Sequence, residues 1–238
     1  MANLQGTALT KENIEGAFRQ VKDLYPVPEG EVRLVSPEII ESAIRFIRDS
    51  FVKDEPVGAA FGIQWDDNAD GFWRHAFSEG LSLAVVSANS GQVIAIRGIA
   101  PITRGVNYDV PDSADDRLKR FLSYMNYCHE KSNFFQHYDI QEALHFFGLG
   151  VHEAYRRKGI ATKLFQTALA FVKSLGLDKV YVKGESSSDF SRRIYDKFGF
   201  ELLLENFYKD CTFAGAGGLK VTGGHAAYSD YGKCITNE

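Results

Sequence analysis

A short turn in the second half of the chain combines basic side chains with a glycine. The apolar run Leu144–Val151 is typical of a strand, and Arg156-Arg157-Lys158-Gly159 leads from it into the amphipathic helix predicted over Arg157–Leu175. Such a helix directs free backbone N–H groups and the positive end of its dipole into the loop. A pyrophosphate fits that end, and glycine lets the backbone approach the anion closely. A solvated basic helix start is the alternative, because short glycine-containing patterns also match by chance.

A second motif follows further along the chain. Ser191-Arg192-Arg193-Ile194-Tyr195-Asp196-Lys197-Phe198-Gly199-Phe200 predicts a helix that carries a tyrosine, then Gly-Phe at the start of a strand. This segment resembles one signature of the GNAT superfamily of N-acetyltransferases, and Arg156-x-x-Gly159-x-Ala161 resembles that superfamily's acyl-CoA-binding motif. Two motifs at the right separation, each in its predicted setting, are more specific than either alone. The resemblance covers roughly Val32–Tyr208.

The resemblance implies an acetyl-CoA-dependent N-acetyltransferase with the GNAT fold, an α/β fold whose mixed central sheet has helices on both faces. In that superfamily the strand before the loop contacts the pantetheine through its backbone, and the loop amides hold the pyrophosphate. Carried over to this chain, the cofactor-binding residues are Leu149, Gly150, Val151, Arg156, Arg157, Lys158, Gly159, Ile160, Ala161 and Thr162.

The tyrosine of the second motif has two interpretations. In the superfamily, a Tyr at the place of Tyr195 often lies near the thioester sulfur and can protonate the leaving thiolate. A half-buried aromatic residue on an amphipathic helix is an equal alternative from the sequence. For Phe198 and Phe200, packing in the core is the preferred interpretation.

An acidic turn in the first quarter of the chain, Lys53-Asp54-Glu55-Pro56, could supply a base. Pro56 moves Glu55 out of the helical region of backbone conformation, which fixes the turn. A primary amine has a pKa of about 10, so it arrives protonated, and a carboxylate can take its proton directly or through water. A solvated helix end is the alternative for two adjacent acids.

This turn resembles the Asp-Glu-Pro-Leu stretch of the insect arylalkylamine (dopamine) N-acetyltransferases, whose Glu is the catalytic base. The resemblance implies that role for Glu55, and it places Ser187 and Ser191 at the positions of two serines implicated in catalysis. Ser187 also lies in a run of serines that could cap the next helix. Cys128, Cys211 and Cys234 lie in no motif for an acyl-cysteine intermediate, a disulfide framework or a zinc site, so we expect direct transfer without a metal.

The chain departs from the insect family at three places. Val57-Gly58 replaces the usual Leu-Asn, residues 62–71 do not match closely, and insect members often have an aliphatic residue at the place of Tyr195. The acceptor is therefore open: an arylalkylamine such as dopamine, serotonin or octopamine, or else a polyamine, an amino acid or a protein amine. A catalytically silent acyl-CoA-binding domain is the alternative from another class, but it has no need of a base at Glu55.

Composition narrows the class of protein further. The chain of 238 residues has a net charge of −4, which argues against nucleic-acid binding. Residues 1–15 lack the features of a signal peptide, and no apolar run has the length of a membrane span. We therefore expect a cytoplasmic protein whose partner is a small-molecule amine, with no nucleic acid and no membrane.

Periodicity predicts the elements that position these motifs. Residues 1–30 are expected to form a helical extension, and residues 31–238 a single GNAT acetyltransferase domain. The expected helices are Lys11–Leu24 capped by Thr10, one from Ile39 to near Lys53 with Ser36 as cap and Pro37 at its first position, one within Phe72–Ser78, one within Asp112–Phe135, Arg157–Leu175 closed by Gly176, and Asp189–Lys197. The expected strands are Glu31–Val35, Leu81–Val86 and Val93–Ile99 joined as a hairpin, Leu144–Val151, Val180–Val182, Glu201–Phe207, and an edge strand in the glycine-rich tail.

Overall fold

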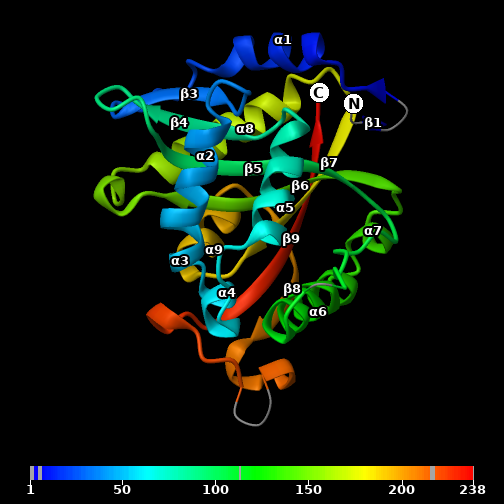
Figure 1. Cartoon of the computed structure of the whole chain (residues 1–238). Helices are drawn as coiled ribbons and strands as arrows, with labels where there is room; N and C mark the ends of the chain where they lie inside the picture. Colours follow the sequence, from blue (N-terminus) through cyan, green and yellow to red (C-terminus); the bar gives the residue numbers. More distant parts are fainter. Residues whose placement is uncertain (1–2, 5–6, 113, 215–217, 238) are drawn as a thin grey trace.

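The structure is a computed structural model that describes residues 3–4, 7–112, 114–214 and 218–237. Its centre is a sheet of seven strands in the order β3-β4-β5-β6-β7-β9-β8, in which only β6 and β7 run parallel (Figure 1). The strands are β3 (Gly30–Leu34), β4 (Leu83–Ser87), β5 (Val93–Thr103), β6 (Glu142–Val151), β7 (Lys179–Ser186), β8 (Glu201–Phe207) and β9 (Ala227–Thr236). In a separate two-stranded sheet, β1 (Asn3–Leu4) pairs antiparallel with β2 (Thr7–Ala8).

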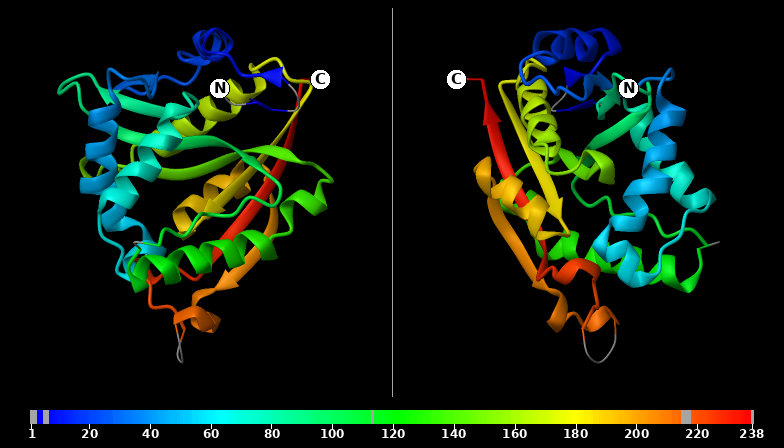
Figure 2. Two further views of the ribbon diagram at one scale, coloured as in Figure 1. Left: turned by 45° about the vertical axis from the view of Figure 1, so that its right-hand side comes forward. Right: turned by 90° about the vertical axis from the view of Figure 1, so that its left-hand side faces the viewer.

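Helices cover both faces of this sheet, as predicted for the fold class (Figure 2). One face carries α1 (Lys11–Val21), α8 (Ile160–Lys173) and α9 (Asp189–Lys197). The opposite face carries α2 (Ile40–Phe46), the π-helix η1 (Ile47–Phe51), α3 (Val52–Asp54), α4 (Pro56–Phe61), α5 (Asp67–Ser78), α6 (Asp116–Lys131) and α7 (Phe134–His137). Short 3₁₀ turns lie at η2 (Glu153–Tyr155), η3 (Tyr208–Asp210), η4 (Thr212–Ala214) and η5 (Thr222–Gly224).

Several elements confirm the sequence predictions closely. Thr10 caps α1 by accepting a hydrogen bond of 3.2 Å from the Asn13 N–H, and α9 and β8 have the predicted bounds. The predicted hairpin is present as β4 and β5. These elements were predictable because caps, turns and amphipathic periodicity are local signals.

The start of the first long helix was predicted wrongly. The N-cap of α2 is Ile39, not Ser36, and no side chain caps this helix; a turn in which the Ser36 carbonyl accepts hydrogen bonds from the N–H groups of Ile39 and Ile40 precedes it. The helical path then runs to Asp54 through the π-helix η1. This wider turn places the Phe51 ring against the Trp73 ring, with 5.6 Å between their centroids.

The tail strand was also predicted wrongly as an edge strand. β9 lies between β7 and β8, and the edges of this sheet are β3 and β8. Its residues Ala227–Gly232 are buried, and a Cβ at Gly232 would collide with the Tyr138 ring. The glycines that precede the strand concealed this central character, because the sequence there lacks a long apolar run.

Aromatic rings fill the core between the sheet and α8. Phe165 has no exposed surface, and its ring stacks on Phe198 with 5.2 Å between centroids. It also packs against Tyr195 at 5.1 Å and against Phe200 at 5.6 Å. The expected core role of Phe198 and Phe200 is thus confirmed, and the Tyr195 ring is part of the same packing.

Candidate active site

The two parallel strands β6 and β7 part in the middle of the sheet. Within these two fully described strands, the last paired residues are Phe146 and Gly184. From there β6 continues to Val151 and pairs only with β5, so its edge toward β7 is open. The predicted pantetheine residues Leu149, Gly150 and Val151 lie on this unpaired part of β6.

A bulge shapes β6 just beyond this point. Ile96 pairs with Gly150 but Gly98 pairs with Phe147, so β6 carries an extra residue relative to β5. Gly148 has a φ of +55°, and a Cβ there would collide with the Trp73 ring. The bulge therefore depends on a glycine, and it turns the backbone of β6 at the place where the thioester is expected.

The start of α8 has the features of an anion site. Gly159 is the N-cap residue with a φ of +77°, and no described side chain caps the helix there, so the N–H groups of its first turn are free of intrahelical partners. By contrast, side chains cap α1, α5, α6 and α9. A Cβ at Gly159 would meet nothing within 4 Å, so the space above the turn is open. The predicted residues Ile160, Ala161 and Thr162 form this turn and fit a pyrophosphate.

The basic side chains of the loop are partly engaged by the protein itself. Arg156 donates a hydrogen bond of 2.9 Å to the Val151 carbonyl and forms an ion pair with Asp54. Lys158 lies 3.6 Å from a Glu29 carboxylate oxygen. Arg157, with a φ of +62°, is exposed. Arg156 thus connects the loop of the cofactor motif directly to the acidic turn.

The carboxylate of Glu55 sits at the joint between α3 and α4. Its ψ of 115° is extended, as Pro56 at the first position of α4 requires. The carboxylate caps α4 by accepting hydrogen bonds from the N–H groups of Val57, at 3.2 Å, and Gly58. Ser187, just after β7, also hydrogen-bonds this carboxylate. The fold therefore brings together Glu55 and Ser187, two residues that the sequence separates widely.

Burial changes the acid strength of Glu55. Desolvation raises its pKa above the usual value of 4.5, and the nearby charge of Glu185 adds to this effect. The hydrogen bonds from Ser187, Gly58 and Val57 oppose it by stabilising the charged form. A carboxyl with a raised pKa is better suited to accept a proton near neutral pH than an exposed one.

The second predicted serine has different partners. The N-cap of α9 is Ser188, not Ser187, and it accepts a hydrogen bond of 3.2 Å from the Ser191 N–H. The Ser191 hydroxyl lies 2.9 Å from the Ser188 hydroxyl and donates to the Ser188 carbonyl at 3.0 Å. Ser191 therefore holds the start of α9, whereas Ser187 is directed to Glu55.

Tyr195 lies at the point where β6 and β7 part. It is fully buried, and its hydroxyl donates a hydrogen bond of 3.1 Å to the carbonyl of Phe146, the last paired residue of β6. Its ring lies against Gly184, where any Cβ would collide with it, and stacks on Tyr231 with 4.7 Å between centroids. The hydroxyl also accepts a hydrogen bond of 3.3 Å from Arg97.

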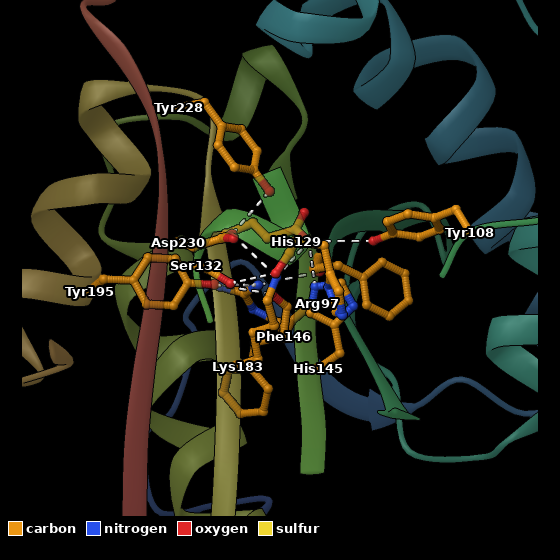
Figure 3. Close-up of polar contacts among 12 residues, drawn as sticks. Arg97, Tyr108, His129, Ser132, His145, Phe146, Lys183, Tyr195, Tyr228 and Asp230 are labelled. Carbon is orange, nitrogen blue, oxygen red and sulfur yellow. Dashed lines mark hydrogen bonds and ion pairs between the residues drawn. The ribbon is translucent and has the colours of Figure 1, made fainter. Parts of the chain in front are cut away.

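A buried polar cluster lies nearby that the sequence analysis did not single out (Figure 3). Lys183 lies 3.5 Å from Glu185 and 3.3 Å from Asp230, and His145 lies 2.8 Å from Glu185. Arg97 and His145 interrupt the mainly apolar strands β5 and β6, whereas Lys183, Glu185 and Asp230 lie in strands with several polar residues. The interruption of an apolar run was thus a signal for Arg97 and His145 only.

Tyrosines surround this cluster and the acid. The Tyr108 hydroxyl donates to Glu185 at 3.3 Å, and the Tyr228 hydroxyl donates to Asp230 at 3.0 Å. The Tyr208 hydroxyl donates to the Ser187 carbonyl at 2.8 Å, which fixes the backbone beside Glu55. Phenol donors thus hold the carboxylates and Ser187 in place from three different segments of the chain.

Part of the chain matches a known family. Residues 131–200 match the family model of the acetyltransferase (GNAT) family. A segment of 76 residues is 34% identical to N-alpha-acetyltransferase 50 of Danio rerio, which covers 31% of this chain and 45% of that protein. The chain thus matches less than half the length of this relative.

Solved structures match nearly the whole fold. Arylalkylamine N-acetyltransferase 2 from Aedes aegypti superposes with a TM-score of 0.75 at 19% identity, covering 87% of this chain and 99% of that one. A mutant of agmatine N-acetyltransferase in its apo form superposes with a TM-score of 0.71 at 17% identity, covering 87% and 100%. The chain therefore has the GNAT fold and carries the GNAT acetyltransferase signature over residues 131–200. The predicted resemblance to the GNAT superfamily is confirmed, and the relatives named above are N-acetyltransferases.

The described residues offer neither a metal site nor a membrane-spanning helix. Among them, no group of three or more His, Cys, Asp or Glu side chains is placed to hold a metal ion. No helix formed by these residues is long and apolar enough to cross a membrane.

Gly159→Ala tests the anion site at the start of α8. Gly176, just after the end of this helix, is the matched control, because both glycines have nearly the same φ, +77° and +76°, and open space around a Cβ. Alanine at either position should lower the free energy of unfolding by about 1–2 kcal/mol. Only Gly159→Ala should also weaken acetyl-CoA binding, by about tenfold or more in Kd by calorimetry. Equal Kd values for the two variants would contradict the site.

Glu55→Gln tests the raised pKa of the acid through stability. Above the usual carboxyl pKa of 4.5, folded Glu55 retains a proton that the unfolded chain has already lost. The native state then binds more protons, so the free energy of unfolding of the wild type falls as pH rises through this window. Glu55→Gln does not lose stability in this way, because a glutamine side chain does not titrate. Urea unfolding at a series of pH values should therefore show the wild type losing stability relative to Glu55→Gln as pH increases. A stability difference between the wild type and Glu55→Gln that is constant with pH would refute the raised pKa. Glu38→Gln, which removes the charge of a carboxyl that is 77% exposed, is the control.

Proposed function

We propose that this protein transfers an acetyl group from acetyl-CoA directly to a primary amine, with an arylalkylamine as the preferred acceptor. The observation that carries this proposal is the partly buried Glu55 carboxylate held by Ser187 and two backbone N–H groups. A protein that only binds acyl-CoA has no need of a desolvated base. Glu55 is positioned at the same end of the molecule as the cofactor loop through the Asp54–Arg156 ion pair.

In this proposal the chain binds acetyl-CoA along the open edge of β6. The backbone of Leu149, Gly150 and Val151 takes the pantetheine, and the uncapped first turn of α8 takes the pyrophosphate. The exposed Arg157 and its basic neighbours add positive charge around the phosphates. This places the thioester near the bulge at Gly148, where β6 turns beside Trp73.

The chemical steps then follow from the side chains around the bulge. Glu55 takes a proton from the ammonium group, directly or through water, and the freed lone pair attacks the thioester carbon. A backbone N–H of Leu149–Val151 stabilises the oxyanion. As the intermediate collapses, the C–S bond breaks, its electron pair stays on sulfur, and Tyr195 supplies the proton that converts the thiolate to the thiol. Ser187 holds the Glu55 carboxylate in place. Ser191 contributes indirectly, because it stabilises the start of α9.

Aromatic side chains favour an arylalkylamine as acceptor. Phe72 is 45% exposed, and its ring lies 6.0 Å from that of Phe147 and 6.3 Å from that of Tyr108 between centroids. These rings lie beside the bulge and offer an apolar surface for an aromatic substrate tail. The similar fold of an arylalkylamine N-acetyltransferase supports the same choice.

A cationic aliphatic amine is the second candidate acceptor. The carboxylate of Glu185 provides negative charge close to Glu55, and agmatine N-acetyltransferase has a similar fold. A substrate with two positive charges would profit from such an environment. Lys183, 3.5 Å from Glu185, already neutralises part of that charge, which is why we rank the arylalkylamine first.

Replacing the base tests the mechanism. Glu55→Ala should lower the rate of acetylation at neutral pH by about 10²–10⁴-fold, because the amine is then protonated and lacks its acceptor. The loss should shrink as pH approaches the pKa of the amine, where free amine is already present. Stopped-flow detection of thiol release measures both effects. Asp49→Ala, an exposed acid paired with Arg48 on the same helical path, is the control. An unchanged rate for Glu55→Ala near pH 7 would exclude this base.

The choice of acceptor has its own test. A panel of arylalkylamines, agmatine, polyamines and amino acids is assayed with acetyl-CoA by thiol release. The aromatic surface predicts that kcat/KM for arylalkylamines exceeds that for the aliphatic amines by about tenfold or more, the effect of a few buried carbon atoms. The reverse order would make the second candidate the substrate class.

A further inference from the structure

A single arginine lies inside the apolar core under α8. Arg97, in the middle of β5, is 1% exposed, and it shares its face of the sheet with its cross-strand partner Leu83. Its guanidinium carbon lies 4.9 Å from the centre of the Phe165 ring, 5.3 Å from that of Phe146 and 5.7 Å from that of Tyr195. Three aromatic rings thus surround a positive charge.

This cation is incompletely paired. One nitrogen, Nη1, donates to the Phe147 carbonyl at 3.2 Å and to the Tyr195 hydroxyl at 3.3 Å. The other two nitrogens, Nε and Nη2, are buried without a hydrogen-bond partner in the described part of the chain. Among these residues Arg97 also forms no ion pair, and burial lowers its pKa. A buried charge without a carboxylate is costly, so stability does not explain its presence.

The position of Arg97 connects it to the proposed chemistry. Its two acceptors lie where β6 and β7 part: Phe147 is the first residue of β6 beyond the last pair, and Tyr195 reaches the carbonyl of Phe146 in that pair. Figure 3 shows the side chains of Arg97 and Tyr195 directed toward each other. The arginine therefore holds both the start of the bulge and the hydroxyl expected to act on the thiolate.

We propose that Arg97 is a positioning residue that holds the Tyr195 hydroxyl at the opening between β6 and β7 and balances the negative charge that this hydroxyl acquires when it protonates the leaving thiolate. The inference rests on the proposed acetyl transfer, and it adds a residue that no motif of the sequence indicated. Arg97 does not contact the substrate amine in this arrangement, and it acts through Tyr195.

The charges balance in this step. The C–S bond breaks and its electron pair goes to sulfur. The proton leaves the Tyr195 oxygen for sulfur, so that the thiol departs and the oxygen keeps the electron pair of its O–H bond. The tyrosinate is then paired with the Arg97 guanidinium. Glu55 releases the proton of the amine to solvent, and Tyr195 regains a proton from solvent before the next cycle.

A purely structural role makes different predictions. If Arg97 serves packing or holds the Phe147 carbonyl, its loss should lower stability and act independently of Tyr195. If it balances a transient charge, Arg97→Met should keep or raise stability, because an apolar side chain of similar length replaces an unpaired buried charge. It should lower the rate only where the Tyr195 hydroxyl is present.

A double-mutant cycle separates these roles. Arg97→Met, Tyr195→Phe and the double variant are compared by single-turnover thiol release, acetyl-CoA KM and thermal unfolding. We expect Arg97→Met to slow thiol release by about 10²-fold, the size of a lost oxyanion contact, with little change in KM. In the Tyr195→Phe background, Arg97→Met should slow thiol release by less than about threefold. Arg97→Lys, which keeps the charge, should recover part of the rate.

Controls and contrary outcomes are well defined. Tyr231→Phe removes a hydroxyl from the ring stacked on Tyr195 and should leave the rate unchanged, since that hydroxyl faces Asp196. Equal losses from Arg97→Met in both backgrounds, or no loss at all, would overturn the inference while the wild type remains an acetyltransferase. A lowered unfolding temperature with no rescue by lysine would assign Arg97 a structural role. A wild type that releases no thiol with any amine would overturn the proposed function itself.

Discussion

The limited pairing between β6 and β7 is the constraint on which the rest of the site depends. Parallel strands that paired along their whole length would leave no free backbone edge in the middle of the sheet. Here pairing ends at Phe146 and Gly184, and the bulge at Gly148 turns β6 away from its neighbour. The opening leaves peptide groups of β6 free for the cofactor. The loop that follows β6 then places the first turn of α8 at the far end of this opening.

The acidic turn couples the amine side to this opening. The Glu55 carboxylate is both a helix cap and the expected base, so the interactions that stabilise α4 also fix the position of the base. Ser187 reaches it from the end of β7, the same strand that forms one wall of the opening. The ion pair between Asp54 and Arg156 ties the turn to the cofactor loop. Acetyl-CoA and the amine would therefore both be positioned by the strand pair β6–β7, and not by two independent loops.

Local signals made part of this structure predictable from the sequence. The glycine before α8, the proline after Glu55 and the periodicity of α9 each act within a few residues, and each was identified correctly. Long-range contacts were out of reach: that Ser187 rather than Ser191 meets Glu55 depends on how α9 is capped by Ser188. The buried Arg97 was also missed, because charge in an apolar strand indicates that a site exists without indicating which residue it faces. The place of β9 in the sheet is topological, and periodicity carries no information on strand order.

The insertion of β9 between β7 and β8 has a consequence for how the chain acquires its structure during synthesis. β8 is made before β9, yet its only partner in the described sheet is β9. Until β9 emerges, β7 presents a bare edge and β8 is left without hydrogen-bond partners, while the strands from β3 to β7 can already assemble. A ribosome-bound intermediate of this protein would thus have its cofactor loop before its sheet is complete. Exposed edges of this kind are where nascent chains engage chaperones or associate with one another.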